Sequence, residues 1–312
     1  DIDKIKIKNI KKKLNIKTFF NYKKAINSTN PDTVIILTPS GLHAEHICYA
    51  LNQKCNVIVE KPMCLKISDA KKILYLSKKK QKRVFVVMQN KFNLPILKLR
   101  EDIKNNKFGK ILHGSVIVRW MRDNNYYRQA NWRGKWRYDG GVICNQASHH
   151  LDLMRTIMGE PISVYAKGFK HLAKIECEDT ALIIFQFKEK KTGIMEATTA
   201  MRPLNVEGSF SLMGSKGSAK IGGFALNEIS YYNLNSNTDK KKYNTKPKNV
   251  YGYGHIEFYK HFLNSIIKNN KSEFECEEAI KTVKLINAIY KSIEKKKEIF
   301  LNNKIESKKL GN

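Results

Sequence analysis

Residues 34–62, VIILTPSGLHAEHICYALNQKCNVIVEKP, decide the fold of this chain. The run VIIL at residues 34–37 is apolar and rich in β-branched residues, which is typical of a strand buried on both faces of a parallel sheet. A Thr-Pro-Ser turn ends that strand, and residues 43–52 have the pattern of a helix. A second short apolar run, residues 57–59, ends at the sequence EKP. The stretch therefore predicts a strand-helix-strand unit.

The same alternation continues on both sides of this unit. Helices are predicted at residues 4–14, 22–26 and 68–79, and a further strand at residues 84–88. Repeated βα units with short strands indicate a doubly wound parallel sheet of the Rossmann type over residues 1–90. The first strand of such a sheet is missing from the sequence.

After residue 90 the period changes to alternating apolar and polar residues, which predicts a mostly antiparallel sheet. We therefore expect an α+β domain over residues 91–312 with an open-faced sheet. Its strands are expected at residues 112–120, 162–169, 180–187, 193–200 and 208–213, and its helices at residues 145–158, 256–268 and 277–296. The helix at 277–296 is expected to pack back on the first domain, and residues 307–312 to be frayed.

The net charge of +30 raises the possibility of nucleic-acid binding. The basic residues are spread along the whole chain in Lys-rich runs, and no segment combines Arg with aromatic residues as a reading surface would. We therefore expect no nucleic-acid partner. A positive surface would favour anionic small molecules, including nucleotide sugars.

The six cysteines form no CxxC pair and no tight framework, which is typical of free thiols in a reducing compartment. No apolar run approaches the roughly 18 residues of a membrane helix, and the charged start of the chain does not resemble a signal peptide. We expect a soluble cytoplasmic protein without a membrane partner.

Three stretches together are similar to a known family. TPSGLHAEHICYAL (residues 38–51) followed by VIVEKP (residues 57–62) resembles a strand, loop, helix and EKP turn of the Gfo/Idh/MocA oxidoreductases. DGGVICNQASHHLDLM (residues 139–154) resembles that family's double glycine followed by HxxD on a helix. The resemblance covers nearly the whole chain and implies an NAD-dependent sugar dehydrogenase.

The resemblance makes Lys61 a catalytic residue that also touches cofactor and substrate. It follows a strand at the carboxyl edge of a parallel sheet, where a dinucleotide lies. An ammonium group there would stabilise the alkoxide that develops as hydride leaves the substrate carbon. Because this chain is so rich in lysine, an isolated Lys would be a solvated charge; its place between Glu60 and Pro62 favours the catalytic role.

On the helix expected at 145–158, Asn145, His149 and Asp152 would share one face. His149 is expected to be the general base that takes the hydroxyl proton, and Asn145 to assist it. The neighbouring His150 is assigned to the core. Many family members carry Asp where this chain has Asn145, and an amide cannot raise the pKa of His149 by charge. We therefore expect a less basic His149.

The resemblance implies further contacts. The residues expected to bind cofactor are Asp1, Thr38, Pro39, His43, Glu60, Lys61, Gln89, Trp132 and Arg133. The residues expected to bind substrate are Lys61, Arg133, Asn145, Gln146, His149 and Asp152. An acidic residue at position 1 would bond the adenosine ribose, which favours NAD over NADP.

The Asn-Gln pair at residues 145–146, together with NWRGKW (residues 131–136) and YGYGH (residues 251–255), is similar to the branch that oxidises the 3-hydroxyl of UDP-N-acetylglucosaminuronic acid. That branch serves the biosynthesis of surface polysaccharide. Another sugar or inositol dehydrogenase of the family remains an alternative. Open-faced sheets of the kind expected after residue 90 often pair face to face, so we expect a homo-oligomer, a dimer or a tetramer.

Two other motifs are set aside. GSKGSAKIGG (residues 214–223) imitates a phosphate loop but joins two β-runs, so a hairpin is expected there. The His149, His150 and Asp152 side chains are spread around a helix with no Cys nearby, so no metal site is expected.

No GxGxxG loop occurs in the sequence, although such a loop carries the pyrophosphate in dinucleotide-binding folds. The family's usual layout would place it in a segment of roughly 35 residues before Asp1. We expect this chain by itself to bind NAD weakly, and a catalytically inactive chain that binds a ligand or partner remains an alternative.

Overall fold

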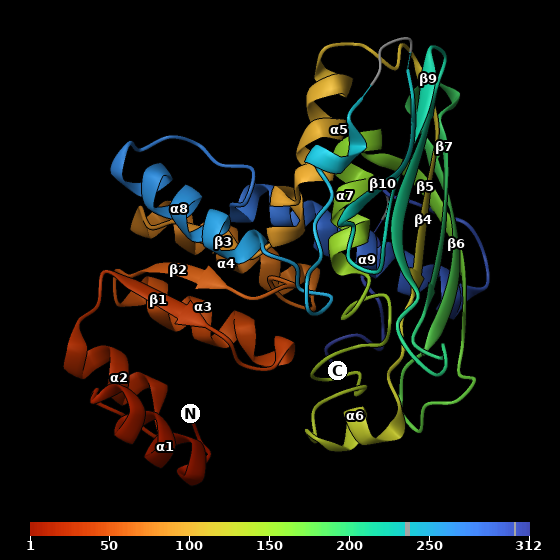
Figure 1. Cartoon of the computed structure of the whole chain (residues 1–312). Coiled ribbons are helices and arrows are strands. Elements are labelled where there is room, and N and C mark those ends of the chain that lie inside the picture. Colours follow the sequence, from red (N-terminus) through yellow and green to blue (C-terminus); the bar gives the residue numbers. More distant parts are fainter. Residues whose placement is uncertain (235–237, 303) are drawn as a thin grey trace.

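The computed structural model describes residues 1–234, 238–302 and 304–312. Two sheets organise the molecule, a three-stranded one near the N-terminus and an eight-stranded one that forms the right-hand side of Figure 1. The predicted combination of a Rossmann-type parallel sheet with an α+β domain is confirmed. No helix in the described part of the chain is both long and apolar enough to cross a membrane.

The first sheet is parallel throughout, with strand order β1-β2-β3. Its strands are short and rich in Val and Ile, as expected where helices cover a sheet. Its elements and their attached helices are α1 (Lys4–Leu14), α2 (Tyr22–Thr29), β1 (Thr33–Ile36), η1 (Ser40–Leu42), α3 (His43–Asn52), β2 (Asn56–Val59), α4 (Ile67–Lys80), β3 (Val84–Val86) and η2 (Gln89–Phe92).

Strand β1 is not buried on both faces, so the sequence-based prediction was wrong there. Ile35 in β1 and Leu37, directly after the strand, expose 48% and 68% of their surface. Within the described residues β1 pairs only with β2, and a cavity lies along its other side. An apolar β-branched run indicates a strand, but it does not reveal whether the strand occupies the edge of its sheet.

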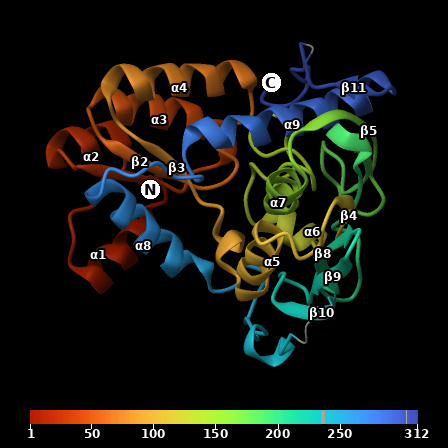
Figure 2. The ribbon, with the colours of Figure 1, turned by 90° about the horizontal axis from the view of Figure 1, so that it is seen from above.

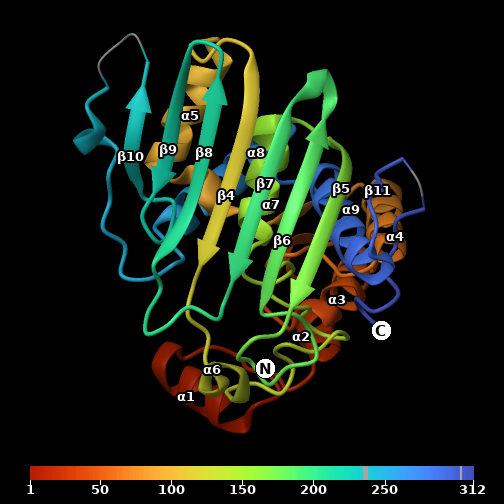
Figure 3. The ribbon, with the colours of Figure 1, turned by 90° about the vertical axis from the view of Figure 1, so that its right-hand side faces the viewer.

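The second sheet has the strand order β10-β9-β8-β4-β7-β6-β5-β11, and all pairs are antiparallel except β4 with β7. Figure 3 shows the uncovered face of this sheet, with helices behind it. The predicted hairpin at residues 214–223 is confirmed, because Gly214 pairs with Gly217. The strands are β4 (Ile111–Arg119), β5 (Pro161–Phe169), β6 (Thr180–Phe187), β7 (Thr192–Thr198), β8 (Glu207–Gly214), β9 (Gly217–Gly222), β10 (Glu228–Asn233) and β11 (Ile299–Phe300).

The helices after residue 92 are α5 (Leu94–Lys104), α6 (Asn124–Arg128), α7 (Ser148–Met158), α8 (Gly254–Ile267) and α9 (Cys276–Lys295), with short turns η3 (Lys188–Lys190) and η4 (Lys240–Lys242). Helices α5, α7 and α9 lie between the two sheets, α8 lies over the small sheet, and α6 lies at one end of the large sheet (Figure 1). Figure 2 shows α9 running from the first sheet towards β5. It contacts both α4 and β5, and Asn287 Nδ2 donates to the carbonyl of Leu65. Helix α9 therefore joins the two parts of the molecule.

Residues 307–312 are packed rather than frayed, contrary to the prediction. Leu310 is completely buried, and Gly311 N donates to the carbonyl of Trp136 at 2.9 Å. The side chain of Leu310 lies against Gly140. This glycine has a φ of +76°, which L side chains rarely adopt, and a Cβ at this position would lie unusually close to Leu310. The segment is mostly polar, which led to the prediction of fraying, but its one large apolar residue, Leu310, is buried and holds it in place.

Leu310→Ala should lower the free energy of unfolding by about 2–4 kcal/mol, because it leaves a cavity at a fully buried site. Urea unfolding followed by circular dichroism measures the change. Lys308→Ala, at an exposed neighbouring position, is the control and should stay within about 0.5 kcal/mol of the parent. Equal stability of the two variants would show that the tail is frayed after all.

Candidate functional site

The ends of β1 and β2 are held together by His43. Its Nε2 lies 2.8 Å from the carbonyl of Thr38, and its Nδ1 lies 2.8 Å from the carbonyl of Pro62. The ring is buried, and burial lowers its pKa to about 4, so it is neutral and donates to one carbonyl at a time. His43, a predicted cofactor ligand, thus contacts backbone carbonyls at both strand ends through its two ring nitrogens.

Lys61 extends from the end of β2 to the segment before α7. Its ammonium donates to the backbone carbonyl of Asn145 at 2.6 Å and to Asn145 Oδ1 at 3.1 Å. Burial lowers the pKa of Lys61, while the carboxylates of Glu60 and Asp139 oppose that shift. An ammonium has three donors, so one remains for a substrate hydroxyl beyond the two bonds described.

Asn145 does not lie on α7, because that helix begins at Ser148; the predicted start at residue 145 was wrong. Residues 139–147 form a turn instead. The Asn145 amide therefore faces Lys61 through its oxygen, and its Nδ2 donates to Asp139 Oδ1. No hydrogen bond between Asn145 and His149 occurs in the described residues. The amide orients the lysine rather than the imidazole.

His149 lies in the first turn of α7, with 9% of its surface exposed. Burial lowers its pKa well below the usual range, and the positive charge of Lys61 adds to the shift. Its Nδ1 is buried without a hydrogen-bond partner among the described residues. At neutral pH the ring is uncharged, which is the state that a general base requires. The adjacent His150 is fully buried against Trp120, with ring centroids 5.6 Å apart.

Asp152, predicted to bind substrate, lies instead inside a buried ion network. Lys91 Nζ is 2.8 Å from one carboxylate oxygen, and Arg155 Nη2 and Thr282 Oγ1 donate to the other at 3.2 and 2.6 Å. Burial alone would raise the pKa of Asp152, but the two cations outweigh it and lower the pKa to about 2. The network ties α7 to η2 and α9, so Asp152 holds the helix that carries His149.

Arg133 and Gln146 contact Tyr126, which sequence reasoning missed, and Trp132 lies near the Arg133 guanidinium. The Arg133 guanidinium lies 4.0 Å from the centre of the Tyr126 ring and 5.6 Å from that of Trp132. Gln146 Nε2 lies 3.4 Å from the Tyr126 hydroxyl. Arg133 Nε is buried and has no partner in the described part of the chain. This cluster could therefore offer a donor to an anionic group.

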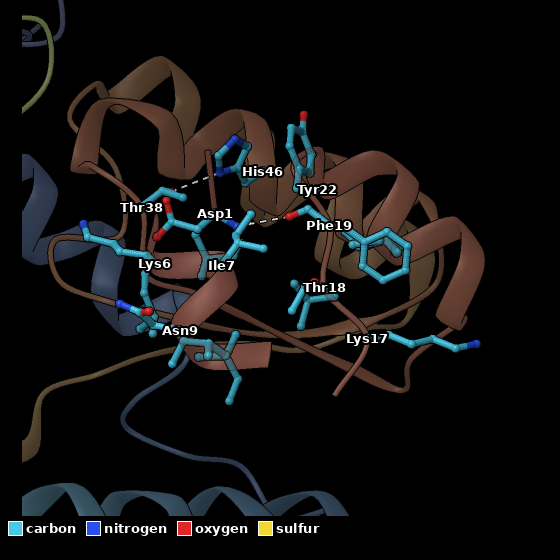
Figure 4. Close-up of a pocket in the computed structure, with 17 residues that line it drawn as sticks. Asp1, Lys6, Ile7, Asn9, Lys17, Thr18, Phe19, Tyr22, Thr38 and His46 are labelled. Carbon is cyan, nitrogen blue, oxygen red and sulfur yellow. Dashed lines mark hydrogen bonds between the residues drawn. The ribbon is translucent and has the colours of Figure 1, made fainter. Parts of the chain in front are cut away.

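A cavity of about 700 Å³ lies between α1, α2 and β1 (Figure 4). Asp1 and Thr38 line it together with His46, and Thr38 Oγ1 lies 3.0 Å from His46 Nδ1. The Asp1 carboxylate accepts only a local backbone N–H, from Asp3 at 3.0 Å, among the described residues. The structure therefore brings two predicted cofactor residues to one cavity.

The remaining predicted cofactor residues follow the strand ends. Pro39 and Glu60 are half-buried, and Glu60 Oε2 accepts the backbone N–H of Lys61 at 3.3 Å. Gln89 follows β3 and is buried; its Oε1 has no partner among the described residues. An unpaired buried amide oxygen at a strand end suits a polar ligand group.

The carboxylate of Asp139 is the other group that sequence reasoning missed. It accepts from Gly134 N at 2.8 Å as well as from Asn145, and burial raises its pKa to about 6. Asp139 opens the DGG stretch at residues 139–141, so its position next to two glycines was a usable signal. The Glu178 carboxyl lies behind the same turn and accepts from Ile143 N at 3.1 Å.

Comparison with known proteins gives two family matches that together cover most of the chain. Residues 1–88 match the description "Oxidoreductase family, NAD-binding Rossmann fold", and residues 100–301 match "Oxidoreductase family, C-terminal alpha/beta domain". Among curated relatives, myo-inositol 2-dehydrogenase of Thermotoga maritima is 25% identical over 228 residues, which are 70% of this chain and 64% of that protein. The matches span less than two thirds of the length of the curated relatives considered.

Two solved structures are similar over 96% of this chain. The WlbA dehydrogenase of Bordetella pertussis, in complex with NADH and UDP-GlcNAcA, is 30% identical, with a TM-score of 0.91 and 88% of its chain covered. The WlbA dehydrogenase of Chromobacterium violaceum, with the same two ligands, is 31% identical, with a TM-score of 0.89 and 86% covered.

Asp152→Asn should lower the free energy of unfolding by about 3 kcal/mol near neutral pH, because Lys91 and Arg155 lose their one buried carboxylate and keep only more exposed partners, Glu273 for Lys91 and Glu160 and Glu278 for Arg155. The carboxylate stabilises the fold above its unfolded pKa of about 3.9, and this contribution is lost as the pH falls through the folded pKa of about 2. Urea unfolding of both proteins at several pH values should therefore show a gap that narrows in acid.

Glu257→Gln is the matched control, since Glu257 pairs with Lys260 on an exposed helix surface. It should change stability by less than about 1 kcal/mol at every pH. A gap for Asp152→Asn that stays constant down to about pH 2 would contradict the role assigned to the ionised carboxylate.

Proposed function

Because the chain belongs to the Gfo/Idh/MocA family of oxidoreductases, we propose that it is an NAD-dependent dehydrogenase that oxidises C3 of a UDP-N-acetylhexosaminuronic acid. The observation that carries the proposal is the placing of the Lys61 ammonium and the neutral His149 ring around one turn, residues 139–147. The likeness to the two WlbA dehydrogenases, over 96% of this chain, supports the choice of substrate.

The residues present fit part of the dinucleotide; no GxGxxG loop for its pyrophosphate occurs in the sequence, so this chain by itself should bind NAD weakly. Asp1 offers a carboxylate to the adenosine ribose at the cavity beside β1, which favours NAD over NADP. The unpaired oxygen of Gln89, with Thr38, Pro39 and Glu60, would meet the cofactor at the strand ends. NAD, when bound by these residues, would supply the acceptor for the hydride.

The chain supplies the proton chemistry of the reaction. His149 accepts the proton of the substrate hydroxyl through its buried imidazole, whose Nδ1 has no hydrogen-bond partner among the described residues. Its lowered pKa leaves the ring neutral at neutral pH and also makes it a weaker base, as expected where an amide stands at position 145. Lys61 turns its remaining N–H towards the same oxygen and stabilises the negative charge that develops there. Asn145 holds the ammonium at that position, and the buried surroundings strengthen each of these interactions.

A second cavity supports a nucleotide sugar over a neutral sugar. It measures about 830 Å³ and shares Arg133 with the cluster around Tyr126. Its cationic lining residues are Arg128, Arg133, Lys135, Lys170 and Lys174, opposed by Glu176. A guanidinium binds phosphate and carboxylate groups through paired donors, so this cavity suits the diphosphate or the uronate. A neutral sugar or inositol, the substrate of the alternative dehydrogenases, carries no anionic group that could pair with these cations.

The open face of the large sheet supports a homo-oligomer. Leu182, Ile184, Ile194 and Met213 each expose about half of their surface, and Ile184 pairs with Ile194 across neighbouring strands. They belong to β6, β7 and β8, which lie side by side with β4 in the open face of Figure 3. Apolar surface of this kind on a sheet is typical of a contact between copies. We place the protein in the cytoplasm as a dimer or tetramer that serves surface-polysaccharide synthesis.

The protein should reduce NAD when it is supplied with UDP-GlcNAcA, and NADH fluorescence measures the rate. Myo-inositol at the same concentration should give a much lower rate, because it cannot use the cationic cavity. Lys61→Ala and His149→Ala should lower the rate by about 10²-fold or more with little change in NAD affinity.

Calorimetry with UDP-GlcNAcA alone separates binding from turnover. Binding without turnover would support the alternative of an inactive ligand-binding chain, and faster oxidation of myo-inositol would overturn the substrate assignment. Unchanged turnover in both single variants would place the catalytic groups elsewhere.

Ile184→Asp with Ile194→Asp should convert the oligomer to a monomer, because two carboxylates would enter an apolar contact. Light scattering after size exclusion measures the mass. Ile267→Asp, at an exposed apolar residue on α8, is the control. A monomeric parent protein, or an unchanged mass in the double variant, would exclude this face as the interface.

A further inference from the structure

The carboxylate of Asp139 lies one hydrogen bond behind the amide that holds Lys61. Asp139 Oδ1 accepts from Asn145 Nδ2, and its other oxygen accepts from Gly134 N at 2.8 Å. The opposite end of the Asn145 amide, Oδ1, accepts from Lys61 Nζ at 3.1 Å. The three side chains form a continuous line from a buried carboxylate to the ammonium.

A side-chain amide can be turned around, since its oxygen and nitrogen occupy similar space. An ionised carboxylate only accepts hydrogen bonds, so it selects the orientation in which Nδ2 faces Asp139 and the oxygen faces Lys61. The reversed amide would direct its N–H groups at the ammonium and its oxygen at the carboxylate, which is repulsive at both ends. Asp139 therefore decides which atom of Asn145 meets Lys61.

We propose that Asp139 is a positioning residue, which fixes the orientation of the Asn145 amide and keeps Lys61 protonated. Its carboxylate would supply the negative charge that position 145 lacks, where this chain has an amide. This inference rests on the proposed function for its effect on turnover, but its effect on Lys61 is a property of the chain alone. The line of hydrogen bonds supplies negative charge from residue 139, six positions earlier in the sequence.

The charges around Lys61 act in both directions. Glu60, Asp139 and Cys144 raise its pKa, whereas burial and Arg122 lower it. Arg133 and Lys61 both favour the ionised form of Asp139, against its burial. Because Asp139 is the carboxylate bonded to Asn145, removing its charge disturbs both the orientation of the amide and the protonation of the lysine.

The test compares Asp139→Asn with the parent protein by competitive acylation. Trace acetic anhydride reacts with the unprotonated amine only, and mass spectrometry of the peptide that contains Lys61 gives its reactivity relative to exposed lysines. Loss of one nearby charge should lower the pKa of Lys61 by about one unit and raise its reactivity about tenfold. In turnover, kcat should fall about tenfold with little change in KM, and the alkaline limb of the pH profile should move to lower pH.

Two further variants separate positioning from a merely structural role. Asp179→Asn removes another buried carboxylate, which bonds the backbone of residues 171–173, and should leave the reactivity of Lys61 unchanged. The exchange Asp139→Asn with Asn145→Asp returns a carboxylate to the lysine and keeps an amide behind it, so it should restore low reactivity and much of kcat.

Unchanged Lys61 reactivity in folded Asp139→Asn would overturn the inference, whatever the activity. If Asp139→Asn fails to fold, the double variant Asp139→Asn with Asn145→Asp takes its place in the test. The inference would also be overturned if this double variant folded and its Lys61 were as reactive as Lys61 in the unfolded chain. Absence of turnover in the parent protein would count against the proposed function and would leave the acylation result standing.

Discussion

The contact between Lys61 and Asn145 is the interaction on which the site depends. The two residues are 84 positions apart, and the ammonium from the small sheet meets the turn before α7 at 2.6 Å. A buried ammonium is costly unless its donors are satisfied, so this contact favours one relative placement of the two parts. Helix α9 packs on both parts and supports the same placement.

The buried polar groups around this contact have divided roles. Lys91, Asp152 and Arg155 form an ion network that holds α7 in place, whereas His149 on the same helix keeps an unpaired nitrogen in the described structure. Burial lowers the pKa of His149 well below its usual range, and the Asp152 carboxylate opposes that shift only in part. On α7, Asp152 thus has ion-pair and hydrogen-bond partners, whereas the His149 nitrogen has no hydrogen-bond partner among the described residues. A buried group with a shifted pKa is typical of reactive side chains.

Alternation predicted the central strands of the large sheet, since β6 alternates strictly between buried and exposed residues and β4 alternates between buried and half-buried ones over residues 114–119. Short apolar runs predicted the parallel strands β2 and β3, which are almost wholly buried. It could not show that β1 is an edge strand, because pairing depends on the rest of the sheet. Helical spacing placed Asn145 and Asp152 on one face, whereas the helix starts only at Ser148. Asp139 was missed because its hydrogen bond to Asn145 depends on the irregular turn between them. Neither helical nor strand periodicity brings residues six positions apart together in this way. The fold was thus more predictable than the individual roles in the site.

The packing of Leu310 against Gly140 links the C-terminal segment to the turn that carries Asp139 and Asn145. A carboxypeptidase that trimmed residues 307–312 would remove the side chain that covers this glycine. The turn would then gain freedom next to Lys61, although no residue of the site had been cut. Limited proteolysis at the end of the chain would therefore act on the candidate site from outside it.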